Sequence, residues 1–124
     1  DKDKTITNDM AWYPGDEYVD IIARDYYCKN LNTPYHSSLK QEYDELRKIT
    51  GGKKLITLAE CDAIPSVENM FNDGAMWSWA MPWYGQDADG IDYFNSVYNT
   101  STFMKKFFNS PYVITRDQVP SFKE

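Results

Sequence analysis

Short apolar runs alternate with longer amphipathic stretches along the 124-residue chain, and turn residues separate them. Residues 18–27 form the first apolar run, directly after a Pro-Gly-Asp turn, and we expect a strand there. Residues 37–49 carry apolar side chains at helical spacing, which predicts an amphipathic helix with Ser37 or Ser38 as its N-cap. Two glycines at 51 and 52 end this helix.

The same alternation continues to the end of the chain. We expect a buried strand over 53–60, a short helix over 66–72, a third strand over 75–84, a polar loop over 85–92, a helix over 93–109 and a short extended segment over 113–115. Residues 99–101 form helices poorly and are expected to weaken the last helix.

The predicted order is three consecutive strand–helix units, which is typical of α/β proteins with a parallel sheet. A (β/α)8 barrel has eight such units and about 250 residues, so the chain has about half of that length and three of the units. An open three-layer sheet is the competing architecture. Its nucleotide-binding version would need a glycine-rich turn after the first strand, and residues 26–30 contain no glycine.

Charge and composition exclude several classes of function. Thirteen basic against nineteen acidic residues give a net charge of −6, which argues against a nucleic-acid partner because such binding depends on Lys and Arg. No apolar run approaches the roughly 18 residues of a membrane span, so we expect none. The charged first residues do not form a signal-peptide core, although this leaves secretion open.

Cysteine and histidine are too few for most catalytic or metal sites. Cys28 and Cys61 do not form a disulfide framework or a metal-binding motif, and we expect two free buried thiols rather than a bridge. His36 is the single histidine and is expected to be exposed in a polar turn. We therefore expect no metal and no cofactor, and carboxylates remain the candidates for proton chemistry.

Polar and aromatic side chains lie at the end of each predicted strand. The strand ends carry Asp25-Tyr26-Tyr27, Glu60-Cys61-Asp62 and Trp83-Tyr84. Strict alternation would place Glu60 on one face with Leu58 and Ile56. A carboxylate, a phenol and an indole at one edge of a parallel sheet suit a glycosidase. A retaining glycosidase needs a second carboxyl group about 5 Å away, and no other strand end offers an obvious glutamate.

Simpler interpretations of these residues stay open at this point. Glu60 is equally well explained as a solvated carboxylate where a loop begins, and Tyr27 as a partly buried packing residue. Trp83 is by default a residue that fills the core or the rim. Asn99 begins a glycosylation sequon, a triplet that is common by chance.

Four motifs in order resemble the C-terminal half of glycoside hydrolase family 26 β-mannanases. They are WYPGDEYVDIIARD at 12–25, LITLAE at 55–60, DGAMWSWAMPWYG at 73–85 and ITRD at 114–117. The resemblance implies a (β/α)8 barrel of which residues 1–124 supply about the last three strand–helix units, with the N-terminal half absent from the chain.

The resemblance also implies roles for individual residues. Glu60 corresponds to the catalytic nucleophile, Tyr27 to the tyrosine that hydrogen-bonds it, and Trp83 to the tryptophan of the subsite where the bond is cut. Tyr26 and Asp25 are further candidates for substrate binding. The family hydrolyses internal β-1,4 bonds of mannan, glucomannan or galactomannan with retention and without a metal or cofactor.

The chain departs from the family pattern at Ala23 and Asp62, where glycine is common, and in lacking the fourth strand that carries the acid/base glutamate. We therefore expect the chain alone to be close to inactive, with a complementary N-terminal half or self-association completing the barrel. From the resemblance we expect a protein that is secreted or held in the cell envelope. Two alternatives remain: a non-catalytic carbohydrate-binding or vestigial half barrel that uses Trp83 and Tyr84, and a barrel of the same family that acts on β-1,3-xylan or mixed-linkage β-glucan.

Overall fold

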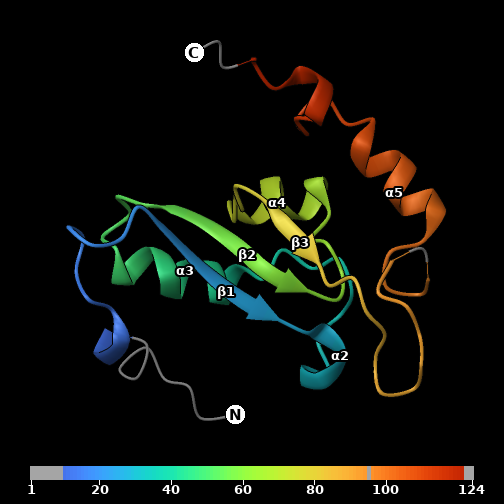
Figure 1. Cartoon of the computed structure of the whole chain (residues 1–124), viewed down its shortest axis with the longest axis horizontal. Coiled ribbons are helices and arrows are strands. Elements are labelled where there is room, and N and C mark those ends of the chain that lie inside the picture. Colours follow the sequence, from blue (N-terminus) through green and yellow to red (C-terminus); the bar gives the residue numbers. More distant parts are fainter. Residues whose placement is uncertain (1–9, 95, 122–124) are drawn as a thin grey trace.

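A three-stranded parallel sheet forms the centre of the protein in a computed structural model that describes residues 10–94 and 96–121 (Figure 1). The strands are β1 (Ile21–Tyr26), β2 (Leu55–Cys61) and β3 (Ala80–Pro82), and they lie in the order β1-β2-β3. Both pairings are parallel, which confirms the sheet that the alternating pattern predicted.

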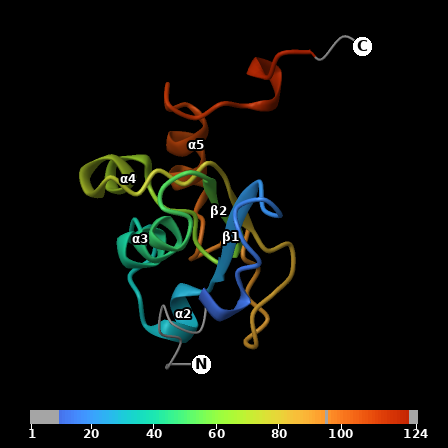
Figure 2. The same ribbon diagram turned by 90° about the vertical axis from the view of Figure 1, so that its left-hand side faces the viewer.

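Helices connect and follow the strands. They are α2 (Cys28–Leu31), α3 (Lys40–Ile49), α4 (Val67–Asp73), α5 (Ser101–Phe108) and the 3₁₀ helix η1 (Arg116–Gln118). Helices α3 and α4 lie on one side of the sheet (Figure 2). The core lies on this side, where the buried Leu46 and Ile49 of α3 belong to one cluster with Ile56 and Leu58 of β2. The sheet is therefore covered on one face and more open on the other.

The third strand is shorter than predicted. The expectation of a strand over 75–84 is right only for Ala80–Pro82, and over residues 75–77 the chain enters the helix layer instead. The buried indole of Trp77 donates a hydrogen bond to the carbonyl oxygen of Ser38 at 2.8 Å, and its ring packs against Tyr43 of α3. Tertiary burial of one large side chain thus outweighs the local strand preference.

Helix α3 begins at Lys40, two residues after the start that an N-cap at Ser37 would give. Its N-cap is Leu39 in the left-handed conformation, so the prediction of Ser37 or Ser38 as the cap is wrong. The Ser38 hydroxyl instead donates to the carboxylate of Asp73 at the end of α4, and this contact ties the two helices together. Helix α4 has the predicted cap, because the Ser66 hydroxyl accepts the N–H of Asn69 at 3.1 Å.

The predicted helix over 93–109 forms only over Ser101–Phe108. The hydroxyl of Thr100 caps it by accepting the N–H of Phe103 at 3.2 Å, in agreement with the weakness expected at residues 99–101. Residues 93, 94 and 96–99 are not helical, because Asn99 is fully buried and hydrogen-bonds backbone groups outside any helix. The segment expected to be extended over 113–115 forms no strand: the N–H of Val113 closes a turn onto the carbonyl oxygen of Ser110, and Thr115 is extended directly before η1.

Candidate active site at the carboxyl ends of the strands

The three strands end at the same level of the sheet. Tyr26 is in register with Cys61, and Cys61 with Pro82. The backbone N–H of Trp83 donates to the carbonyl oxygen of Cys61 at 2.9 Å. This alignment brings the candidate residues Tyr27, Glu60 and Trp83 to one edge of the sheet, where functional side chains of parallel α/β folds gather.

Tyr27 and Glu60 form the central contact at this edge. The Tyr27 hydroxyl donates a hydrogen bond to Glu60 Oε2 at 2.9 Å, and both residues are half-buried. Burial and the adjacent Glu60 carboxylate raise the pKa of the Tyr27 phenol well above its usual range. The phenol therefore stays protonated at neutral pH and remains a donor to the carboxylate.

A bulge in β2 decides which face of the sheet carries Glu60. Arg24 pairs with Leu58 but the next residue, Asp25, pairs with Glu60, so Ala59 is one extra residue in β2. Paired residues of parallel strands point to the same face, and Glu60 therefore lies on the face of Asp25, opposite to Leu58. The expectation that Glu60 shares a face with Leu58 and Ile56 is wrong, because strict alternation fails at a bulge.

Asp25 and Tyr26 take different positions. Asp25 is exposed and in register with Glu60, so it belongs to the same face. Tyr26 is in register with Cys61, its ring packs against the core cluster, and its hydroxyl lies 2.8 Å from the Thr33 hydroxyl. The structure thus groups Asp25 with Glu60 and directs Tyr26 to the helix side of the sheet.

Trp83 and Tyr84 form an aromatic pair after β3. Their ring centroids are 5.0 Å apart, and Tyr84 is 86% exposed while Trp83 is half-buried. A Cβ atom at Gly85 would lie 3.2 Å from the indole nitrogen of Trp83, so a larger residue at 85 would have to displace the indole. The pair presents a partly open aromatic surface at the strand ends.

Asp62 holds the segment that carries Tyr27, a role that the sequence did not reveal. Its fully buried carboxylate accepts hydrogen bonds from the backbone N–H groups of Cys28 and Lys29, both at 2.9 Å, and of Ala63 at 2.7 Å. Tyr27 is the N-cap of α2 and its side chain does not cap the helix, so Asp62 satisfies the first N–H groups of that helix instead. The only feature of the sequence that hinted at this role was the position of Asp62, two residues after Glu60.

Asn99 joins this arrangement from the loop after β3. Its amide nitrogen donates to the carbonyl oxygens of Asp62 at 2.7 Å and Tyr93 at 2.8 Å, and its amide oxygen accepts the N–H of Ile64 at 3.0 Å. The sequon therefore begins at a side chain that is fully buried and hydrogen-bonded. Asn99 has a structural role in the folded chain.

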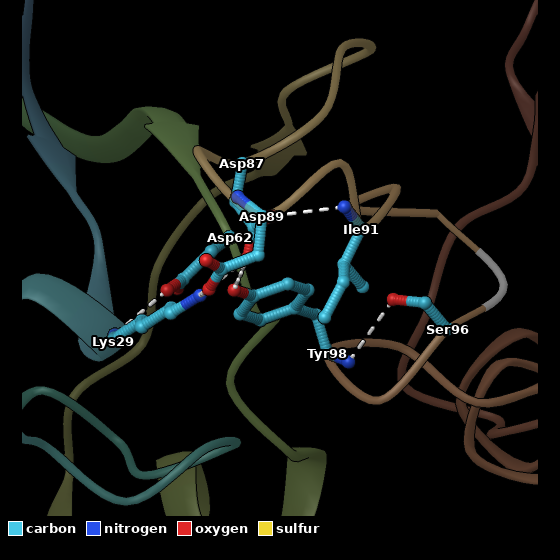
Figure 3. Close-up of polar contacts among 7 residues, drawn as sticks. All are labelled: Lys29, Asp62, Asp87, Asp89, Ile91, Ser96 and Tyr98. Atoms are coloured by element: carbon cyan, nitrogen blue, oxygen red, sulfur yellow. Dashed lines mark hydrogen bonds and ion pairs between the residues drawn. The ribbon is translucent and has the colours of Figure 1, made fainter.

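An ionic cluster connects the same loop to α2 (Figure 3). The ammonium group of Lys29 lies 2.6 Å from Asp87 Oδ2 and 2.5 Å from Asp89 Oδ2. Asp87 also accepts the hydroxyl of Tyr98 at 2.5 Å and the N–H groups of Asp89 and Ile91, both at 2.9 Å. The Lys29 ammonium and the Tyr98 hydroxyl hold the pKa of the Asp87 carboxyl well below its usual range. The loop after β3 is thus fixed beside Tyr27.

The cysteines and the histidine stay outside this chemistry. Cys28 and Cys61 are free and buried, and burial raises the pKa of the Cys61 thiol to about 12. His36 is half-buried rather than exposed, because its ring stacks on Phe103 and its Nδ1 lies 2.8 Å from the carbonyl oxygen of Ile64. Residues 10–94 and 96–121 contain no group of three His, Cys, Asp or Glu side chains that could hold a metal ion. None of the helices within these same ranges is long and apolar enough to cross a membrane.

Comparison with known proteins identifies a set of relatives. The sequence model of the family described as Glycosyl hydrolase family 26 matches residues 2–118. A mannan endo-1,4-beta-mannosidase of Thermothelomyces thermophilus is 30% identical over 114 residues, which are 91% of this chain and 21% of that protein. The chain thus spans about a fifth of this curated relative.

Two solved structures are similar to the chain in fold as well as in sequence. A ruminal GH26 endo-beta-1,4-mannanase matches with a TM-score of 0.81 at 32% identity, over 94% of this chain and 24% of that one. A beta-mannanase from a symbiotic protist of the termite Reticulitermes speratus matches with a TM-score of 0.68 at 30% identity, over 90% of this chain and 31% of that one. The latter was solved in complex with gluco-manno-oligosaccharide.

Proposed function

The chain belongs to glycosyl hydrolase family 26, and we propose that it supplies the nucleophile side of a retaining endo-β-1,4-mannanase. The observation that carries the proposal is the hydrogen bond from Tyr27 to Glu60 at the ends of two neighbouring parallel strands. A nucleophilic carboxylate must stay ionised and oriented, and a protonated phenol that donates to one of its oxygens serves both needs.

In this reaction Glu60 attacks the anomeric carbon of a mannosyl unit. A new bond forms between a carboxylate oxygen and the anomeric carbon while the glycosidic bond breaks, and the bonding electrons leave with the glycosidic oxygen. A second carboxyl group must protonate that oxygen, and water then hydrolyses the glycosyl–enzyme intermediate with retention. We propose that this acid/base glutamate comes from the part of the barrel that precedes the chain.

Neighbouring residues suit the binding of the sugar. Trp83 and the exposed Tyr84 offer aromatic faces for a pyranose ring at the end of β3. Asp25 lies on the Glu60 face of the sheet and is exposed, so it is placed to accept hydrogen bonds from sugar hydroxyls. Tyr26 faces the core side, and we assign it to packing beneath the site rather than to contact with the sugar.

We infer that the chain is the C-terminal half of a (β/α)8 barrel. The sheet has edges at β1 and β3, and a groove of about 760 Å³ lies beside β1 and α3. Large apolar side chains are exposed on the strands or directly before them, including Ile21, Leu55 and Trp79. Unpaired edges and open apolar surface favour association with a complementary N-terminal half, or self-association where that half is missing.

The relatives and the open edge of the sheet support a mannan substrate. β-Mannan, glucomannan or galactomannan is a polymer that does not enter cells, so we propose that the protein acts outside the cell or in its envelope. An endo-acting enzyme needs a site that a long chain can cross. The exposed aromatic pair at the strand ends is compatible with such a site.

Activity of the purified particle tests this function. Native mass spectrometry first establishes whether a second polypeptide accompanies the chain, and the same preparation is then assayed on mannan, β-1,3-xylan and mixed-linkage β-glucan. We expect mannan hydrolysis that requires the complementary half and that is abolished by Glu60→Ala, while Glu17→Ala, which removes an exposed glutamate before β1, retains it. Mannanase activity that survives Glu60→Ala would overturn the assignment of the nucleophile.

A non-catalytic carbohydrate-binding half barrel is the second candidate, and the 86% exposure of Tyr84 next to Trp83 favours it. It predicts mannan binding that Glu60→Ala leaves intact and Trp83→Ala removes, with no turnover in any preparation. Titration calorimetry with manno-oligosaccharides, run beside the activity assay, separates the two functions.

A further inference from the structure

Tyr27 has a second aromatic neighbour besides its hydrogen-bond partner. The ring of Tyr93 meets the ring of Tyr27 edge to face, with centroids 5.6 Å apart and an interplanar angle of 61°. A phenol that reaches Glu60 by one hydrogen bond can still rotate about its side-chain bonds. A ring packed against its side removes part of this freedom.

Tyr93 is itself held from several directions. Its N–H donates to the carbonyl oxygen of Gly85 at 3.3 Å, and its carbonyl oxygen accepts the amide of Asn99 at 2.8 Å. Its ring also packs on Tyr98, with centroids 5.2 Å apart. Because backbone and ring are both fixed, Tyr93 is a rigid support and not a mobile loop residue.

Through Tyr98, Tyr93 is connected to the ionic cluster of Figure 3. The Tyr98 hydroxyl donates to Asp87, and Asp87 pairs with Lys29 of α2. Lys29 lies two residues after Tyr27, and its own backbone N–H is held by Asp62. The contacts therefore form a closed ring that starts and finishes at the segment carrying Tyr27.

We infer that Tyr93 is a positioning residue of the glycosidase site, whose ring holds the Tyr27 phenol against Glu60, and that Tyr98, Asp87 and Lys29 anchor it there. The inference rests on the proposed function, since positioning matters for turnover only if Glu60 is the nucleophile. Tyr93 acts through its ring: among the described residues its hydroxyl has no hydrogen-bond partner that the structure shows, whereas its ring contacts two tyrosines.

Kinetics of the active particle test this role with three variants. Tyr93→Ala is expected to lower kcat about five- to tenfold with little change in KM, the effect expected when one aromatic contact is lost. Tyr93→Phe keeps the ring and is expected to retain kcat. Tyr18→Ala removes a tyrosine that is 74% exposed before β1, and it serves as the matched control.

A double-mutant cycle and a spectroscopic readout separate positioning from mere stability. If Tyr93 acts through Tyr27, the losses caused by Tyr93→Ala and Tyr27→Phe are not additive in the double variant. The ring-flip rate of Tyr27, followed by nuclear magnetic resonance with labelled tyrosine, is expected to rise at least tenfold in Tyr93→Ala and to stay unchanged in Tyr93→Phe and Tyr18→Ala.

Each opposite result overturns the inference. Additive losses, an equal loss in Tyr93→Phe, or an unchanged ring-flip rate in Tyr93→Ala would show that Tyr93 does not act by holding Tyr27. A wild-type particle without mannanase activity would instead count against the proposed function. The ring-flip measurement would then still decide whether Tyr93 restrains Tyr27.

Discussion

The carboxylate of Asp62 accepts the backbone N–H of Cys28 at 2.9 Å, so a side chain at the end of β2 holds the first turn of the helix that follows β1. This bond joins two strand ends that are distant in sequence. Because Tyr27 precedes Cys28 and Glu60 lies two residues before Asp62, it also limits the distance between Tyr27 and Glu60. The Tyr27–Glu60 contact is therefore built on a buried structural contact directly behind it.

Removal of the Asp62 carboxylate is expected to destabilise the fold strongly. Asp62→Ala leaves the buried N–H groups of Cys28 and Ala63, and that of Lys29, without their acceptor, which costs about 3 kcal/mol or more of unfolding free energy. Asp89→Ala is the control, because Asp89 is exposed and solvent screens its ion pair with Lys29, so little stability should be lost. Denaturant unfolding measures both, and equal losses would contradict the role of Asp62.

Loss of the Tyr27 hydroxyl is expected to slow catalysis more than it weakens binding. A hydrogen bond to a charged group contributes about 1.5–3 kcal/mol, so Tyr27→Phe should lower kcat about 10- to 100-fold in the active particle. Steady-state kinetics on mannan check this effect. Tyr26→Phe, which removes a hydroxyl directed to Thr33, should keep kcat within a few-fold, and a comparable loss there would mean that the effect is not specific to Glu60.

The sequence predicted the parallel sheet and the residues at its edge, because both follow from local patterns. Apolar runs locate β1 and β2, and the polar residues at their carboxyl ends locate Tyr27 and Glu60. The face of the sheet on which Glu60 lies could not be predicted. The extra residue at Ala59 reverses the alternation, and nothing in the composition of the strand marks such a bulge. Asp62 and Asn99 were missed for a related reason: most of their partners are backbone groups that lie 33 to 37 positions away.

The buried thiols are expected to make the fold sensitive to alkaline pH. Burial, with the nearby Asp62 carboxylate, raises the pKa of Cys61 from its ordinary value of 9.0 to about 12, and it raises that of Cys28 in the same direction. Above about pH 9 the unfolded chain releases these protons while the folded chain keeps them. Rising pH therefore favours unfolding, by up to about 1.4 kcal/mol per pH unit for each thiol.

Unfolding free energies measured between pH 7.5 and 9.5 check this dependence. The unfolding free energy of Cys61→Ala should fall less with rising pH than that of the wild type, whatever the absolute stability of the variant. A thiol reagent at pH 8 should label the wild type only at the rate of unfolding, because thiolate is the reactive form and neither thiol is accessible. Rapid labelling of the folded chain would refute the burial of these groups.

Thr57 is a position where, in contrast to Asp62, substitution is expected to stabilise the fold. It is fully buried in β2, and within the described ranges its hydroxyl oxygen has no hydrogen-bond partner. Thr57→Val keeps the branched shape that suits a strand and removes the unsatisfied hydroxyl, so it should raise the unfolding free energy by about 1 kcal/mol and Tm by about 4 °C. Thr33→Val is the matched control, because the Thr33 hydroxyl lies 2.8 Å from that of Tyr26 and its removal should lower Tm. If both substitutions lower Tm alike, the Thr57 hydroxyl has a hydrogen-bond partner in solution and is not an unsatisfied group.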